Sequence, residues 1–135
     1  MSHEAPTYAE VDPFDLPEWL GESEVTWESE RPFTADHRVT GQLTSDGHES
    51  MPCDLLAVDD AYPVPVAADE TRMRAHQVWS HGEVLLASEG DRLLLVVPGS
   101  RLDTETVLTA VGRLARAVGA RDGDYAVRLR VGNGR

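Results

Sequence analysis

Two short apolar runs near the middle of the chain constrain its fold more than any other feature. Residues 84–87 and 93–97 are apolar at every position, and residues 88–92 between them have the composition of a tight polar turn. Together they predict a β-hairpin. Because apolar and polar residues do not alternate, both faces of this hairpin need a cover. The chain itself covers both, or a partner chain covers one of them.

A helix after the hairpin is expected to supply one cover. Asp103 is a typical N-cap residue, Glu105 places an acid in the first turn, and Gly119 favours a left-handed end. Between these signals, apolar residues recur at intervals of three and four, namely Val107, Leu108, Val111, Leu114, Ala115 and Val118. Neither element can bury its apolar surface alone, so the helix is expected to lie across the hairpin.

The remaining pattern completes an α+β fold. A second helix is predicted over 69–80, with Met73, His76 and Trp79 along one side and Ala75 as a further member of it, and Asp46-Gly47 predicts a hairpin turn. Other strands are predicted at 24–28, 37–44, 51–58 and 125–131. We therefore expect a mostly antiparallel sheet of about six strands, built from a meander, a hairpin and a closing strand, with two helices packed on one face. The domain spans 12–131, after a mobile acidic N-terminus at 1–11 and before a frayed tail at 132–135.

The charge balance excludes some partners. The 135 residues carry a formal net charge of -12, which disfavours binding to nucleic acid or to an anionic membrane surface. No apolar run approaches the roughly 20 residues of a membrane span. The single cysteine, Cys53, rules out a disulfide within the chain and fits a reducing compartment. These features predict a cytoplasmic protein.

An apolar arm precedes the first strand. Phe14, Leu16, Trp19 and Leu20 crowd into a segment in which Pro13 and Pro17 limit any helix to a turn or two. One interpretation is that these side chains clamp the arm onto the chain's own core. The other is that they anchor a partner protein, with the neighbouring carboxylates as a polar rim.

Candidate chemical groups are few. His76 and His81 could begin a metal site with an acid or Cys53, but a zinc site needs three or four ligands, and ordinary backbone and helix-end roles suit both histidines. Cys53 could be a nucleophile, although its place on an alternating strand favours a small buried side chain. The pairs Asp59-Asp60 and Asp122-Gly123-Asp124 lack the other ligands of a calcium loop. We predict no catalytic residue, metal or cofactor.

Three segments also carry a resemblance. DPFDLPEWL at 12–20, PCDLLAVDDAYP at 52–63 and HQVWSHGEVLL at 76–86 together resemble a family of small, acidic actinobacterial proteins without a known function. The resemblance implies a bacterial cytoplasm with a GC-rich genome, which agrees with a chain whose basic residues are all arginine. It implies no activity, ligand or site residue.

These observations favour a non-enzymatic protein-binding or adaptor module that binds a protein partner or a second copy of itself. Phe14, Leu16, Trp19, Leu20, His76, Trp79 and His81 are its candidate binding residues. The alternative is a small enzyme or ligand-binding protein with a pocket near Trp79, His76 and Cys53. A third hypothesis, that the acidic surface mimics nucleic acid, rests on charge alone.

Overall fold

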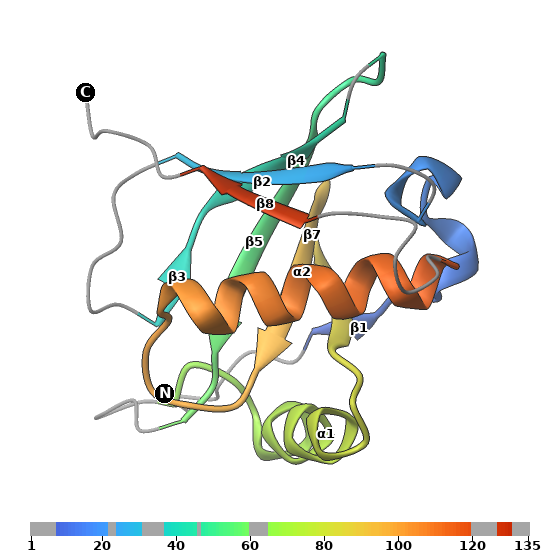
Figure 1. Cartoon of the computed structure of the whole chain (residues 1–135). Helices are drawn as coiled ribbons and strands as arrows, with labels where there is room; N and C mark the ends of the chain where they lie inside the picture. The colour runs from blue at the N-terminus through green and yellow to red at the C-terminus, as the bar shows by residue number, and fades with distance from the viewer. Residues whose placement is uncertain are drawn as a thin grey trace.

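The computed structural model describes residues 8–21, 24–30, 37–45, 47–59 and 65–119, together with the backbone of 127–130. It confirms an α+β fold with two helices and a mostly antiparallel sheet (Figure 1). The strands are β1 (Ala9–Glu10), β2 (Val25–Ser29), β3 (Arg38–Val39), β4 (Gly41–Thr44), β5 (Met51–Ala57), β6 (Leu85–Glu89), β7 (Arg92–Val97) and β8 (Val127–Arg130). The helices are the short 3-10 turns η1 (Pro13–Asp15) and η2 (Glu18–Gly21), followed by α1 (Asp69–Ser80) and α2 (Thr104–Val118).

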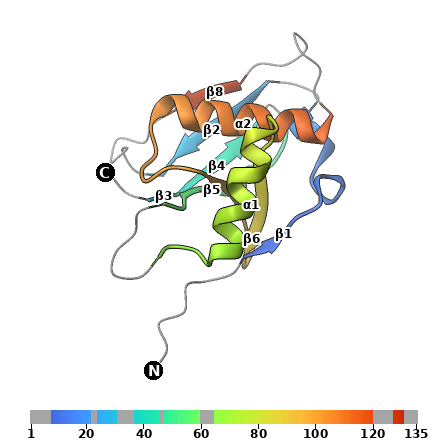
Figure 2. The same ribbon diagram turned by 90° about the horizontal axis from the view of Figure 1, so that it is seen from below.

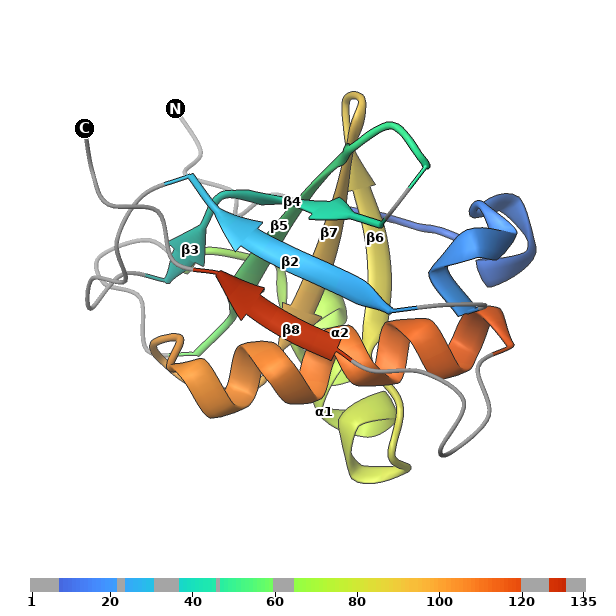
Figure 3. The same ribbon diagram turned by 45° about the horizontal axis from the view of Figure 1, so that its top comes forward.

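The sheet has the order β1-β6-β7-β5-β4-β2-β8, and β3 pairs with β5 beside this path. The predicted meander and hairpin are present, with Gly90 at a φ of +58° in the two-residue turn between β6 and β7. Two neighbouring pairs are parallel, β5 with β7 and β2 with β8. The sheet curves, and Figure 3 shows β2 and β8 running obliquely in front of β5 and β7.

The two helices cover different faces of the central strands. On β7, Leu93, Leu95 and Val97 belong to the core cluster that contains the buried side of α2. Leu94 and Val96, which alternate with them, belong to the cluster that contains the buried side of α1. The prediction of one shared helical face is therefore corrected. The continuous apolarity of the hairpin arises because α1 and α2 each cover one side of it, and Figure 2 shows the two helices running in different directions.

The helices begin and end where local signals predict. The Asp103 side chain accepts a hydrogen bond from the Thr106 backbone N–H at 2.7 Å, and Gly119 ends α2 with a φ of +123°. Helix α1 has the predicted bounds but a different buried side. Thr71, Ala75 and Val78 face the sheet, whereas Met73 is 67% exposed and His76 is also exposed. Of the predicted side, Ala75 is buried and Trp79 is half-buried, so the prediction is corrected at Met73 and His76.

The N-terminal segment also differs from expectation. Ala9 and Glu10, inside the segment predicted to be mobile, pair with β6 opposite Ser88 and Ala87. The Val11 backbone N–H continues this edge with a hydrogen bond of 2.8 Å to the Leu86 carbonyl. The predicted acidic turn at 122–124 and the tail at 132–135 lie outside the described residues.

Candidate functional site

The arm at 12–21 is held in shape by its own sequence. The Asp12 carboxylate accepts a hydrogen bond from the Phe14 backbone N–H at 2.9 Å, and Pro13 occupies the first position of η1, where no N–H is needed. The backbone N–H of Leu16 then closes the turn onto the Pro13 carbonyl at 3.1 Å. The DPFD sequence therefore builds a capped turn rather than an extended segment.

The four apolar side chains of the arm separate into two groups. Leu20 is buried, and Leu16 and Trp19 are partly buried against the core cluster beneath α2. The Trp19 ring also stacks on the His48 ring, with centroids 5.1 Å apart and an interplanar angle of 13°. Phe14, in contrast, is 95% exposed. Leu16, Trp19 and Leu20 therefore agree with the interpretation that the arm packs on the chain's own core. Phe14, which points away from the core, agrees with the interpretation that the arm binds a partner.

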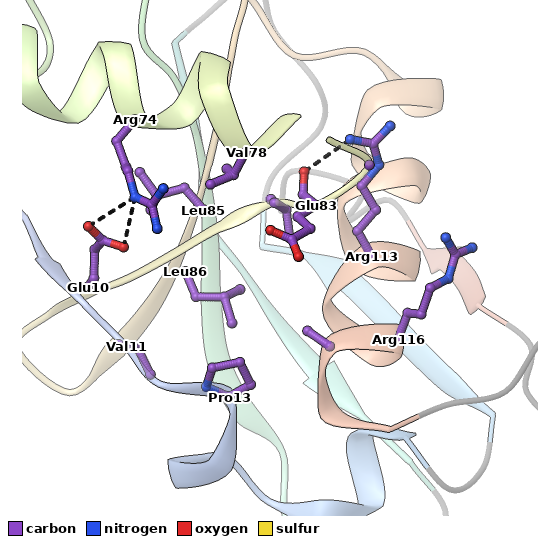
Figure 4. A pocket seen from close by; sticks show the side chains of 13 residues that line it. Glu10, Val11, Pro13, Arg74, Val78, Glu83, Leu85, Leu86, Arg113 and Arg116 are labelled. Atoms are coloured by element: carbon purple, nitrogen blue, oxygen red, sulfur yellow. Dashed lines mark hydrogen bonds and ion pairs between the residues drawn. The ribbon is translucent and has the colours of Figure 1, made fainter. Parts of the chain in front are cut away.

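A pocket of about 290 Å³ opens beside the arm, and we call it the arginine pocket (Figure 4). Its floor is apolar, with Leu85, Leu86 and Val11 between walls from both helices. Charged side chains stand around this floor, and the full lining is Glu10, Val11, Pro13, Arg74, Val78, Gly82, Glu83, Val84, Leu85, Leu86, Arg113, Arg116 and Ala117. Three arginines against two glutamates give the pocket a net positive charge in a chain of net charge -12.

Two of these arginines tie the walls of the pocket together. Arg113 of α2 donates hydrogen bonds from Nη1 to the backbone carbonyls of Trp79 at 2.9 Å and Glu83 at 3.0 Å. Its guanidinium carbon lies 3.9 Å from the centroid of the Trp79 ring, a cation–π contact. Across the pocket, Arg74 Nε lies 3.3 Å from a Glu10 carboxylate oxygen. The pocket is therefore fixed by contacts among α1, α2 and β1.

A second hollow, the arm groove, lies on the other side of η1 and has a volume of about 320 Å³. Its lining consists of Pro13, Phe14, Leu16, Glu18, Gly21, Ala117, Val118 and Gly119. Pro13 and Ala117 line both hollows. Phe14 lines the arm groove and directly follows Pro13, which is shared by both hollows.

The predicted pocket near Trp79, His76 and Cys53 does not form as expected. Cys53 is fully buried in the cluster beneath α2, so its thiol cannot line an open pocket, and burial raises its pKa well above the ordinary value. His76 instead lies on the exposed side of α1, with Nε2 2.9 Å from a carboxylate oxygen of Asp59. His81 caps α1, with Nδ1 2.9 Å from the Gln77 carbonyl oxygen.

Asp59 is also part of the loop after β5. Its Oδ2 accepts a hydrogen bond of 2.7 Å from the Gly99 backbone N–H. Burial alone would raise the pKa of Asp59, but this bond and the contact with His76 hold it below its ordinary value. The His76–Asp59 pair therefore joins α1 to the loop after β5, and Asp59 links that loop to Gly99 after β7.

The structure contains a buried ion cluster that was not predicted from the sequence. Asp54 of β5 is 0% exposed, with Arg38 Nη2 2.6 Å and Arg92 Nη2 2.7 Å from its two carboxylate oxygens. Arg38 also forms an ion pair with Glu89, and Arg92 forms one with Glu30. The available signal was the aspartate inside the otherwise apolar run 53–58. The Asp54 carboxylate accepts hydrogen bonds from both arginines and from the Gly41 backbone N–H, so this cluster stabilises the sheet.

No group of three potential ligands arranged for a metal ion occurs among the residues the structure describes. Within those same residues, no helix is both long and apolar enough to cross a membrane. Comparison of the chain with protein-family models, curated proteins and solved structures finds no match. The resemblance to the actinobacterial family stays a prediction.

Proposed function

We propose that this chain is a non-enzymatic protein-binding module that uses Phe14 as its anchor. The observation that carries the proposal is an almost fully exposed phenylalanine on a capped turn, with Val11 before the turn and Leu16 after it packed against the core. Exposing a phenyl ring forgoes about 1.5–3 kcal/mol of burial free energy, and a rigid turn reduces the entropy lost on binding. Both features are typical of a binding anchor.

The chemistry around Phe14 defines the partner surface. Asp12, Asp15 and Glu18 are exposed, and they flank Phe14 in the sequence. A complementary surface needs an apolar cavity for the ring and basic groups at its rim. The buried thiol of Cys53 further supports a binding function over thiol catalysis, and a cytoplasmic location, where a lone cysteine stays reduced, is part of the proposal.

The anchor can be tested by photo-crosslinking in the native cytoplasm. The photoreactive amino acid p-benzoylphenylalanine replaces Phe14 in one variant and Met73 in a second, matched variant. Met73 is the other exposed large apolar side chain in the described part of the chain, and it lies on α1 away from the arm. We expect discrete protein adducts from position 14 and only background from position 73. Equal adducts from the two positions would refute the proposal.

A further inference from the structure

We propose that Phe14 of one copy inserts into the arginine pocket of a second copy, and that the reciprocal contact closes a two-fold dimer. This inference rests on the proposed function and names the partner. The hairpin no longer requires a second chain as cover, because α1 and α2 occupy both of its faces. The surface for self-association is therefore the region around Pro13, where the anchor and the pocket meet.

Charge complementarity favours a second copy as the occupant. The arm presents Asp12, Asp15 and Glu18 around Phe14, and a partner needs an apolar floor with a basic rim. The chain's own pocket has an apolar floor and a net positive rim, with Arg74, Arg113 and Arg116 against Glu10 and Glu83. Two chains of net charge -12 repel each other overall, so contact is favoured where one surface is locally positive.

The size of the pocket also suits a phenyl ring. A closed apolar cavity of about 150 Å³ is enough to hold benzene, and the arginine pocket offers about 290 Å³ above an apolar floor. The ring of the same chain does not use this space, because Phe14 remains 95% exposed. The pocket and the anchor are thus both available for contact with another molecule.

The position of Pro13 makes the contact reciprocal. Pro13 lines the arginine pocket and directly precedes Phe14, so the anchor and the pocket are adjacent on one surface (Figure 4). A two-fold axis near Pro13 brings each Phe14 toward the pocket of the other copy. Such an interface uses the same patch on both chains and closes on itself, which limits assembly to a dimer instead of a fibre.

Sedimentation equilibrium over a wide range of protein concentrations tests the dimer with Phe14→Ala and the control Met73→Ala. We expect the native chain and the control to reach twice the mass of one chain. Because Phe14→Ala removes two buried rings per dimer, its dissociation constant should rise about 100-fold or more. Added salt should also weaken the native dimer, because it screens the contacts between carboxylates and arginines.

A mixing experiment tests whether the pocket is the receptor. Ala117 lies on the exposed side of α2 and lines the pocket, so Ala117→Glu narrows the pocket and repels the acidic arm while Phe14 is kept. Each variant alone should dimerise poorly. In an equimolar mixture, the Phe14 of Ala117→Glu can enter the intact pocket of Phe14→Ala, so a mixed dimer should form more tightly than either variant does alone.

The outcomes separate this inference from the proposed function. A native chain that stays a monomer at every concentration, a dimer unaffected by Phe14→Ala, or a mixture no tighter than its components would each overturn the dimer. Adducts from position 14 to a different protein would overturn the dimer and leave the anchor in place. An adduct at twice the chain mass, lost with Ala117→Glu, would support both.

Discussion

At the scale of single residues, the packing of Gly41 against Trp27 leaves no room for a larger side chain at position 41. A Cβ atom at position 41 would lie 2.4 Å from the Trp27 ring and 2.6 Å from the Glu28 carbonyl oxygen, and Trp27 is completely buried. The ring cannot move away freely, because its Nε1 donates a hydrogen bond of 3.0 Å to the Cys53 carbonyl. Only glycine therefore fits at this position.

We predict that Gly41→Ala lowers the free energy of unfolding by about 2–3 kcal/mol, the usual cost of overpacking a rigid core. The matched control is Gly112→Ala, because a Cβ atom at this position of α2 meets nothing within 4 Å. The control should be neutral or stabilise the protein by up to about 1 kcal/mol, since alanine favours a helix. Urea unfolding of the two variants measures the difference, and equal midpoints would show that the contact with Trp27 relaxes easily.

The stability of the fold at acid pH depends on one buried carboxylate, that of Asp54. Burial by itself raises the pKa of Asp54, but hydrogen bonds from Arg92, Arg38 and the Gly41 backbone N–H outweigh it and hold the pKa below its ordinary value. A carboxylate with a lowered folded-state pKa contributes stability above the unfolded value, about 3.9, and this contribution is lost as the pH falls toward the folded-state pKa.

We expect Asp54→Asn to lower the free energy of unfolding by about 2–3 kcal/mol near neutral pH, because it leaves Arg38 and Arg92 without their buried counter-charge. The loss stays moderate because both arginines keep some contact with water. The difference from the native chain should shrink as the pH falls below about 4. Asp91→Asn, in the exposed hairpin turn, is the control. Unfolding free energies at several pH values give the comparison, and a constant difference down to acid pH would contradict this role for the carboxylate.

At the scale of elements, Arg113 connects the end of α1 to the middle of α2. It donates to the Trp79 carbonyl in the last turn of α1 and to the Glu83 carbonyl in the loop that follows, and it stacks on Trp79, so one side chain bonds two backbone acceptors and covers an aromatic face. Replacing it with lysine retains the charge but not the planar group that makes both contacts.

Arg113→Lys should therefore destabilise the protein by about 1–2 kcal/mol and speed amide exchange at residues 79–84. The control Arg72→Ala removes an exposed pair with Asp69 at 3.5 Å and should change stability by less than about 0.5 kcal/mol. Amide exchange followed by mass spectrometry reads the local effect. Unchanged exchange at the end of α1 would mean that Arg113 does not hold the two helices together.

The elements also show which features the sequence could predict. The bounds of α1 and α2 followed from local signals such as Asp103 and Gly119, and these signals act within one turn of the chain. The buried side of α1 did not follow, because residues 73, 76 and 79 recur at intervals of three while Thr71, Ala75 and Val78 recur at intervals of four and three, and both spacings suit one side of a helix. Which of the two stripes is buried depends on how α1 packs against the sheet, and that contact is not encoded within the helix itself. The arginine pocket was equally hidden, since its walls come from segments more than 60 residues apart.

At the scale of the whole molecule, the curved sheet is wrapped by its own chain. The apolar hairpin predicted two covers, and the sequence identified one of them as the helix that ends at Gly119. The structure confirms that helix as α2 and assigns the other cover to α1. The arm was open to two interpretations because exposure depends on the whole fold. Three of its apolar side chains joined the core and one did not.

The two-residue strand β1 has one further consequence. It occupies the outer edge of β6, where unpaired backbone groups would otherwise invite strands from other molecules. Removing residues 1–10 should convert the protein from a defined species into one that forms thioflavin-positive aggregates, whereas Glu10→Gln, which loses only the ion pair with Arg74, should stay clear. Light scattering during incubation would reveal the difference, and a clear solution of the shortened chain would contradict it. Two residues at the start of the fold would then decide whether the molecule remains dispersed or polymerises.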